Sequence, residues 1–512
     1  MGGQIEPTGR DFGQGIPDLE DGAMLRGQYD GQAVIAIRRG HEYFVVAAAC
    51  SHWGENLADG AVIGDTIRCA HHHACFSIRS GEALTPPALG PIQAFTVEPR
   101  GSGRVVTGPM KHAKPHEMSG GPKSVVIIGG GAAGSACALA LRSEGYNGPV
   151  TMISADADLP CDRPNVSKDY LAGNAPEEWL FLRDAAGWEK AGIELRTRTK
   201  VTRIDRKARQ VQLAGGDTLS YDALLLAPGT EATRLPIPGA DLPHVHVLRT
   251  VDDARQIITK ARDSVSAVVI GSSFIGMEAA ASLKARGIDV HVVSPDTVPF
   301  ARILGPQAGG VLHRAHVKNG VKFHLGRKPA SILQSAVVLD DGSQIAAQLV
   351  VMGVGVRPSL SLAEDAGLTV DRGVIVDDQL RTSDPAIWAA GDVARYVDAR
   401  TRQNVRIEHW VVAQRQGQLA ALAMLGRTVK LDQVPFFWTT QFGLSLRYVG
   451  HAESWDRIDV DGDPDSTNCA FAYRRAGKTL ALAFYGRDRD ALIAGDALAR
   501  GDEAALAAIV PG

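Results

Sequence analysis

The chain has 512 residues, more than one hydrophobic core usually holds, so we expect roughly three to four domains. Hydrophobic residues make up 45% and charged residues 22%, a composition that excludes a disordered or fibrous chain. The formal net charge of -3 excludes a strongly basic surface, so we expect neither nucleic acid nor a membrane as a partner.

The N-terminal segment and the cysteines indicate the compartment. The first residues are acidic and lack the basic start and apolar stretch of a signal peptide. No run approaches the roughly twenty apolar residues that cross a bilayer. The six cysteines are too few and too scattered for a disulfide framework, so we expect a reducing, cytoplasmic environment.

Residues 1–107 form the first predicted domain. From residue 18 onward, short apolar runs such as AVIAIRR and YFVVAAA are interrupted about every eight to twelve residues by glycine, proline or asparagine. This pattern predicts a small all-β sandwich of antiparallel strands. Residues 108–122 mix Pro, Gly, Lys and His without apolar periodicity, which predicts a linker.

A cysteine and histidine motif lies within the predicted sandwich. Cys50 and His52 are followed, after sixteen intervening residues, by Cys69 and His72. A Rieske centre binds one iron through two cysteines and the other through two histidines, and each loop supplies one of each. A tetrahedral zinc site could use the same four side chains. We favour the iron-sulfur centre because the surrounding sequence agrees with it.

The segment of residues 50–88, CSHWGENLADGAVIGDTIRCAHHHACFSIRSGEALTPPA, resembles the Rieske ferredoxin module. The resemblance implies four cluster ligands, which are Cys50, His52, Cys69 and His72. Two positions depart from the family pattern, because Ala70 replaces the usual proline and His73 the usual glycine. A Cβ at a glycine position strains the loop. His71 and His73 are interpreted either as solvent-facing neighbours or as alternative ligands.

Residues 123–245 begin with a buried strand, a helix of small residues and a second strand, the opening of a doubly wound α/β fold. Gly129, Gly131 and Gly134 occupy the first strand-to-helix turn. Their missing side chains allow a tight turn, close pyrophosphate approach and close helix packing. Asp156, 22 residues beyond Gly134, is placed to accept a hydrogen bond from a ribose hydroxyl.

Residues 246–366 repeat this pattern and predict a second dinucleotide-binding domain. Gly271 and Gly276 occupy the first and last positions of the turn, and Ser273 stands at the middle position where glycine is common. The following strand ends in Ser294 rather than in the acid that selects NADH, but Asp296 lies two residues further. No arginine directly follows to hold a 2′-phosphate, so we favour NADH over NADPH.

Several segments identify the chain as similar to the Rieske-fused, FAD-dependent ferredoxin reductases of the pyridine nucleotide-disulfide oxidoreductase superfamily, which also includes apoptosis-inducing factor. They are DLPCDRPNVSK, YDALLLAPGT, TSDPAIWAAGDVA, RIEHWVVAQRQ and VPFFWTTQFG, and the likeness covers nearly the whole chain. The resemblance implies that Lys168 pairs with Glu278 near the nicotinamide. It further implies flavin contacts from Arg163, Lys168, Asp392, Glu408, His409, Trp410 and Trp438. Ordinary core packing remains the alternative for either tryptophan.

The same resemblance implies the domain order. FAD binds to residues 123–245 and 367–430, NAD(P) binds to residues 246–366, and residues 431–512 form a C-terminal α+β reductase domain. Strands are predicted in FFWTTQF, LSLRYVGHA, CAFAYRR and LALAFYG, followed by one final alanine-rich helix.

The sequence lacks the redox cysteine pair that a disulfide reductase carries beside its flavin. We therefore expect electrons to pass from NAD(P)H to FAD, to the fused cluster and then to an external protein such as an oxygenase or cytochrome. Two alternatives remain. The flavin reduces oxygen, a quinone or a nitrite-reducing partner, or the chain is a redox-sensing interaction protein of the apoptosis-inducing-factor type.

Overall fold

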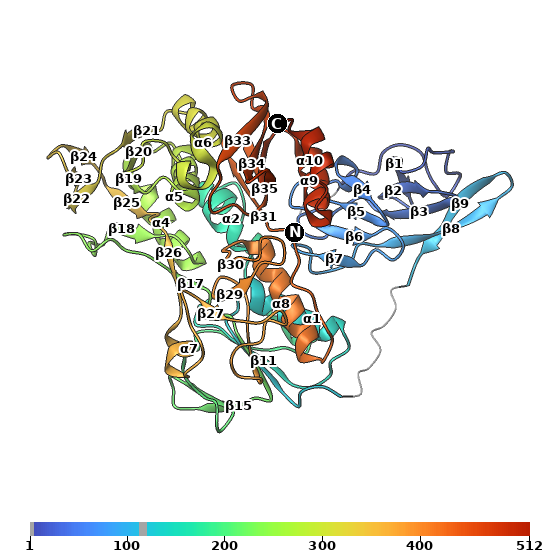
Figure 1. Cartoon of the computed structure of the whole chain (residues 1–512), viewed down its shortest axis with the longest axis horizontal. Coiled ribbons are helices and arrows are strands. Elements are labelled where there is room, and N and C mark those ends of the chain that lie inside the picture. Colours follow the sequence, from blue (N-terminus) through green and yellow to red (C-terminus); the bar gives the residue numbers. More distant parts are fainter. Residues whose placement is uncertain (1–4, 112–119) are drawn as a thin grey trace.

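The computed structural model describes residues 5–111 and 120–512. Its N-terminal domain consists of two antiparallel sheets, as the sequence predicts (Figure 1). The first has the order β1-β2-β3-β8-β9, with β1 (Met24–Tyr29), β2 (Gln32–Arg39), β3 (Glu42–Ala47), β8 (Ala94–Arg100) and β9 (Gly103–Pro109). The second contains β4 (Ala61–Ile63), β5 (Thr66–Arg68), β6 (Cys75–Ser77) and β7 (Ala83–Thr85), preceded by the short helix η1 (Leu57–Asp59).

The predicted linker of residues 108–122 begins too early. Strand β9 continues to Pro109, because Gly108 and Pro109 pair with Thr96 and Phe95 of β8. Strand pairing therefore extends over Gly108 and Pro109, although a glycine and a proline favoured a loop in the sequence. The part of the predicted linker at residues 112–119 lies outside the described residues.

A five-stranded parallel sheet forms the core of the predicted FAD-binding domain. Its order is β12-β11-β10-β16-β28, with β12 (Glu194–Arg196), β11 (Val150–Ile153), β10 (Val125–Ile128), β16 (Ala223–Leu226) and β28 (Ile387–Ala389). The three central strands are buried and, apart from Thr151, apolar, as expected for a parallel sheet covered on both faces. Helices α1 (Ala132–Ser143) and α8 (Trp410–Met424) lie against each other beside this sheet.

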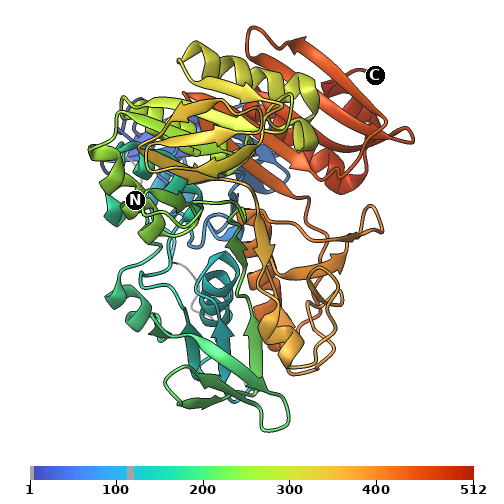
Figure 2. The same cartoon turned by 90° about the vertical axis from the view of Figure 1, so that its left-hand side faces the viewer.

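The second parallel sheet has the order β18-β25-β19-β20-β21 and belongs to the predicted NAD(P)-binding domain. Its strands are β18 (Val245–Val247), β25 (Leu349–Met352), β19 (Ser266–Ile270), β20 (Asp289–Ser294) and β21 (Lys322–Leu325). Helices α4 (Val251–Arg262), α5 (Phe274–Ala285) and α6 (Ala301–Lys318) accompany it. The two parallel sheets lie in separate bodies, one above the other in Figure 2, joined by the antiparallel pair β17 (Thr230–Ala232) and β26 (Val356–Pro358).

Smaller elements complete the two nucleotide-binding domains. Three three-stranded sheets are formed by β13 (Val201–Asp205), β14 (Gln210–Leu213) and β15 (Thr218–Ser220); by β22 (Pro329–Ile332), β23 (Ala336–Leu339) and β24 (Gln344–Ala346); and by β27 (Val374–Ile375), β29 (Ala394–Val397) and β30 (Asn404–Val405). The short helical segments are α2 (Arg163–Asn165), η2 (Val166–Tyr170), η3 (Glu177–Trp179), α3 (Ala185–Lys190) and α7 (Ser361–Asp365).

The C-terminal domain contains one antiparallel sheet of order β31-β32-β35-β34-β33 and two helices. These are β31 (Phe436–Gln441), β32 (Leu444–Gly450), β33 (Arg457–Asp463), β34 (Asn468–Arg475), β35 (Lys478–Tyr485), α9 (Asp488–Arg500) and α10 (Glu503–Ile509). The prediction of one final helix is wrong: Gly501 ends α9 in a left-handed conformation, φ 67°, and the Asp502 side chain caps α10.

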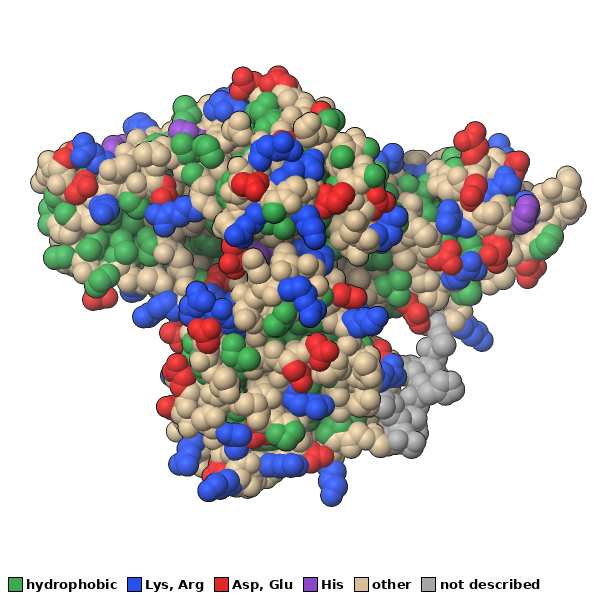
Figure 3. Space-filling model, in the orientation of Figure 1, with side chains coloured by type: hydrophobic (Ala, Val, Ile, Leu, Met, Phe, Trp, Pro, Cys, Tyr) green, Lys and Arg blue, Asp and Glu red, His purple; other side chains and the backbone are tan. Residues whose placement is uncertain are grey.

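The C-terminal domain lies between the N-terminal sandwich and the second parallel sheet (Figure 1). Helix α9 contacts β4 of the sandwich, and β31 contacts both α5 and α8. Acidic and basic side chains are interspersed over the face shown in Figure 3, in keeping with the small net charge. Among the residues that the structure describes, no helix is long and apolar enough to cross a membrane.

Candidate flavin and iron-sulfur site

A cavity of about 1170 Å³ opens where the two nucleotide-binding domains and the C-terminal domain meet. Many of the residues that the sequence assigned to cofactor binding lie in its wall. They are Gly129, Gly131, Asp156, Arg163, Lys168, Glu278, Asp392, Glu408, His409, Trp410 and Trp438. Gly134, Gly271, Gly276 and Asp296 do not line this cavity. The fold thus gathers side chains from five segments of the chain around one space.

In the first glycine turn, two glycines are required by the fold and one leaves space for a ligand. Gly129 has φ 108°, and a Cβ on it would lie 2.0 Å from the Ala227 carbonyl oxygen. A Cβ on Gly134 would lie 1.9 Å from the Gly129 carbonyl oxygen. A Cβ on Gly131, the N-cap residue of α1, by contrast meets no atom within 4 Å. The open space at a helix N-terminus fits a pyrophosphate.

The second turn has the same construction. Gly271 has φ 109° and approaches the Gly353 carbonyl oxygen, to which a Cβ would lie 2.3 Å away. A Cβ on Gly276 would lie 2.2 Å from the Gly271 carbonyl oxygen. Ser273 is the N-cap residue of α5 and lines the cavity, so the serine stands at the position equivalent to Gly131.

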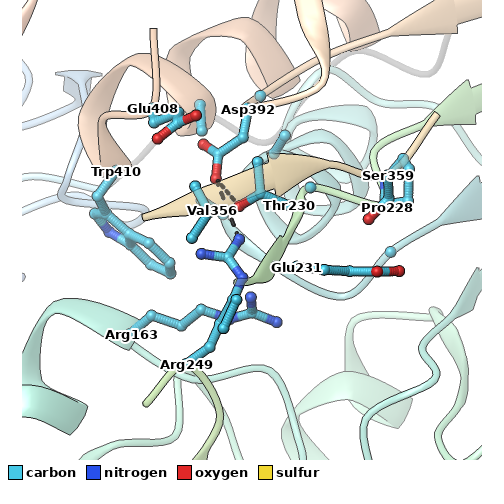
Figure 4. Close-up of a pocket in the computed structure, with 18 of the residues that line it drawn as sticks. Arg163, Pro228, Thr230, Glu231, Arg249, Val356, Ser359, Asp392, Glu408 and Trp410 are labelled. Carbon is cyan, nitrogen blue, oxygen red and sulfur yellow. Dashed lines mark hydrogen bonds and ion pairs between the residues drawn. The ribbon is translucent and has the colours of Figure 1, made fainter. Parts of the chain in front are cut away.

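Two carboxylates in the cavity wall are held by arginines, and Figure 4 shows one of them, Asp392 beside Arg249. Arg163 donates to Asp156 at 2.7 Å. Arg249 and the Thr230 hydroxyl both donate to Oδ2 of Asp392, each at 3.2 Å. Burial lowers the pKa of Arg249. The sequence did not single out Arg249, because it precedes α4 in a segment without a recognisable motif.

Lys168 and Glu278 meet across the two nucleotide-binding domains. The Lys168 Nζ lies 2.9 Å from Oε1 of Glu278, whose side chain is only 4% exposed. The same oxygen accepts from the Thr439 hydroxyl at 2.6 Å, and the other accepts from Ser167 at 2.5 Å. Three polar contacts from two segments, η2 and β31, therefore fix one buried carboxylate beside the cavity.

Aromatic side chains complete the wall. His409 and Trp410 lie at the start of α8, and Trp438 lies on β31. The His409 Nδ1 and Trp410 Nε1 atoms are buried and have no hydrogen-bond partner among the described residues. Burial lowers the pKa of His409 to about 3 and keeps its imidazole neutral. These unpartnered polar atoms suit a bound heterocycle with donors and acceptors of its own.

The four predicted cluster ligands lie together at one end of the sandwich. The Nδ1 atoms of His52 and His72 are 3.1 Å apart. The Cys50 thiol donates to Cys69, which lowers the pKa of Cys69. In residues 5–111 and 120–512, no three Cys, His, Asp or Glu side chains converge on a single ion. A sulfur pair beside a nitrogen pair fits two irons better than one zinc ion.

The neighbouring histidines have different surroundings. His71 is half-exposed and lies 3.4 Å from the Glu55 carboxylate. His73 adopts the left-handed φ of 61° that its glycine position requires, and its ring stacks on Phe436 of β31 at 3.7 Å. Of the two interpretations offered for His73, solvent-facing neighbour or alternative ligand, neither describes this contact with another domain.

Asp296 lies away from the cavity and pairs with Arg302 at 2.9 Å. Ser294, at the end of β20, is buried and lies 2.8 Å from the Ser272 hydroxyl. All six cysteines lie among the described residues, and all are free and buried. Burial raises the pKa of Cys161, at the edge of the flavin segment, to about 12, which keeps it an unreactive thiol.

Comparison with known proteins matches this arrangement. The family models that match are pyridine nucleotide-disulphide oxidoreductase at residues 123–417, Rieske [2Fe-2S] domain at 15–96 and reductase C-terminal at 436–510. Apoptosis-inducing factor 3 of Mus musculus is 32% identical over 496 residues, which cover 92% of this chain and 81% of that protein. Rhodocoxin reductase of Rhodococcus erythropolis is 36% identical over 381 residues, which cover 73% and 89%.

A solved structure of the covalent putidaredoxin reductase–putidaredoxin complex resembles the chain with a TM-score of 0.72 at 30% identity, covering 76% of this chain and 99% of that one. A Rieske sandwich joined to two dinucleotide-binding folds around one cavity defines a multidomain flavin-dependent oxidoreductase. The chain belongs to the pyridine nucleotide-disulphide oxidoreductase family. Membership brings FAD and NAD(P)H, and the Rieske domain brings a [2Fe-2S] cluster, as the sequence predicted.

Proposed function

We propose that the protein is an NAD(P)H-dependent flavoprotein reductase that delivers electrons through FAD to its own Rieske cluster and on to an external acceptor protein. One observation carries this proposal. The ring of the predicted ligand His72 lies 4.4 Å from the ring of Trp438, and Trp438 lines the flavin cavity. A single side chain therefore separates the cluster ligand from the space for the flavin.

Residues of the chain have separable tasks in this function. When bound, FAD accepts a hydride and the cluster accepts single electrons. The turn at Gly131 and the α1 N-terminus would bind the pyrophosphate, while Asp156 and Asp392 would accept hydrogen bonds from hydroxyl groups. The ammonium of Lys168, fixed by Glu278, would stabilise negative charge on the reduced ring.

The acceptor and the nicotinamide are proposed from chemistry and likeness. Rhodocoxin reductase and putidaredoxin reductase are named for the proteins they act on, and the latter has been solved in complex with putidaredoxin, which supports an external protein acceptor such as an oxygenase or cytochrome. We favour NADH because Asp296 closely follows β20, and a carboxylate at this place repels the 2′-phosphate of NADPH. Six free thiols support a reducing, cytoplasmic location.

The test uses the purified holoprotein under anaerobic conditions. NADH should bleach the flavin absorption and then produce the EPR signal of a reduced Rieske cluster. Cys69→Ser should abolish the cluster signal while NADH still reduces the flavin. Cys75→Ser, a buried cysteine outside the ligand set, is the matched control and should behave as wild type. Absence of iron and sulfide, or unchanged electron delivery in Cys69→Ser, would refute the function.

A second candidate is a redox-sensing interaction protein, favoured by the likeness to apoptosis-inducing factor 3 over 92% of the chain. In that case NADH should reduce the flavin slowly, and a long-lived charge-transfer complex should accumulate instead of reduced cluster. Direct reduction of oxygen, a quinone or a nitrite-reducing partner would instead leave turnover intact in Cys69→Ser. Stopped-flow absorption therefore separates the three functions in one set of experiments.

A further inference from the structure

The imidazole side of the Rieske site does not face solvent but lies against the flavin domain. Nε2 of His52 is 3.2 Å from Oδ2 of Asp162, and the indole of Trp53 donates to the same oxygen at 2.7 Å. Asp162 is 3% exposed and is the N-cap residue of α2, whose first residue, Arg163, lines the cavity. The Asn165 side chain adds a third hydrogen bond to this oxygen at 3.1 Å.

The C-terminal domain holds the neighbouring loop of the sandwich. Besides the stacking of His73 on Phe436, the guanidinium of Arg447 on β32 lies 3.4 Å from the Ala70 carbonyl oxygen. Arg447 is only 3% exposed and is also within 3.4 Å of the Asp488 carboxylate. At the rim, Arg68 pairs with Asp496 of α9 at 3.2 Å. The FAD-binding domain and the C-terminal domain thus both contact the cluster loops with buried side chains.

The two departures of this chain from the Rieske pattern both fall in this contact. Ala70 replaces a proline, and its carbonyl oxygen accepts from Arg447. His73 replaces a glycine, keeps the left-handed backbone and uses its side chain to reach Phe436. A strained conformation persists where surrounding packing determines it. A loop built for a freely diffusing ferredoxin would have no use for either contact.

We propose that Asp162 is the positioning residue of an intramolecular dock. Its Oδ2 atom fixes His52 and Trp53, and this contact holds His72 against Trp438 at the flavin cavity. The proposal rests on the proposed function and deepens it: the flavin's electron acceptor is the chain's own Rieske domain, which stays bound to the reductase domains instead of meeting them by diffusion. A separate ferredoxin cannot occupy the docked face, so an external acceptor must approach the Rieske domain elsewhere.

The test compares full-length, cofactor-loaded variants in a graded series. Asp162→Leu removes every hydrogen bond that the Asp162 carboxylate accepts. Asp162→Asn retains an acceptor oxygen without charge. Trp53→Phe removes one donor without touching a ligand nitrogen. Asp65→Asn is the matched control, because Asp65 pairs with Arg79 inside the Rieske domain on an exposed surface. Rapid mixing with NADH gives the rates of flavin and cluster reduction, and hydrogen exchange of residues 69–74 and 436–441 reports docking.

We expect cluster reduction to slow at least tenfold in Asp162→Leu, less in Trp53→Phe and least in Asp162→Asn, with faster exchange in the same order. Flavin reduction by NADH and all rates of Asp65→Asn should equal wild type. Slower cluster reduction in Asp162→Leu with unchanged exchange and a normal Trp53→Phe would show that Asp162 only tunes the cluster, and would overturn the dock. If wild type shows no cluster reduction, the proposed function fails, while exchange alone still decides whether Asp162 docks the domains.

Discussion

Gly131→Ala separates the demands of folding from those of cofactor binding. Gly131 has φ -76° and ψ -161°, a conformation open to alanine, and an added Cβ meets no protein atom within 4 Å. The apoprotein should therefore keep its fold. Its free energy of unfolding should rise by about 0.4–1 kcal/mol, because alanine restricts the unfolded chain more than glycine does.

The same methyl group should weaken FAD binding. It enters the open space at the α1 N-terminus, where a pyrophosphate would receive hydrogen bonds from backbone N–H groups. Losing one hydrogen bond to a charged group costs about 1.5–3 kcal/mol. At 1.4 kcal/mol per factor of ten, this loss corresponds to a Kd about 10- to 150-fold higher.

Urea unfolding of the apoprotein and titration with FAD, followed by flavin fluorescence, measure the two effects independently. Gly134→Ala is the contrasting variant, because its Cβ would lie 1.9 Å from a backbone oxygen. That variant should destabilise the apoprotein by about 1–3 kcal/mol or more. The reasoning fails if Gly131→Ala destabilises the apoprotein as much as Gly134→Ala, or if it binds FAD as wild type does.

Three further predictions concern other parts of the molecule. Lys168→Met leaves the Glu278 carboxylate buried without its cation and should lower the free energy of unfolding by about 3–5 kcal/mol in denaturant titrations. Adding Glu278→Gln should restore most of this loss, and no recovery would contradict the pairing. Burial lowers the pKa of His316 to about 4, against 6.5 in the unfolded chain. The free energy of unfolding is therefore highest above pH 6.5 and falls by about 3 kcal/mol as the pH drops to 4, because the unfolded chain binds the proton more tightly. His316→Gln should flatten that part of the stability profile, and an unchanged slope would argue against it. Arg302→Ala frees Asp296 and should shift kcat/KM towards NADH over NADPH by roughly tenfold, or about 1.4 kcal/mol, whereas a shift towards NADPH would exclude this role for Asp296.

The sequence predicts best what is encoded locally. The turns at Gly129 and Gly271 could be found because an apolar strand, a glycine turn and a helix of small residues follow one another directly in the sequence. Pairs distant in the sequence, such as Lys168 with Glu278, came only from resemblance to a family. Arg249 was missed because its contact with Asp392 depends on how two domains close over the cavity. Neither hydrophobic periodicity nor local residue spacing indicates a contact between two domains.

The His73 position shows why the docked arrangement lay beyond sequence reasoning. Read locally, a histidine where glycine is usual is a defect, since it strains the loop and brings no evident gain. In the folded chain the gain comes from Phe436, more than 360 residues away in the sequence, against which the ring stacks. A local rule broken at a functional loop is best explained by a compensating contact elsewhere. Here that contact joins the cluster loop to β31, the strand that also carries Trp438 of the proposed electron route.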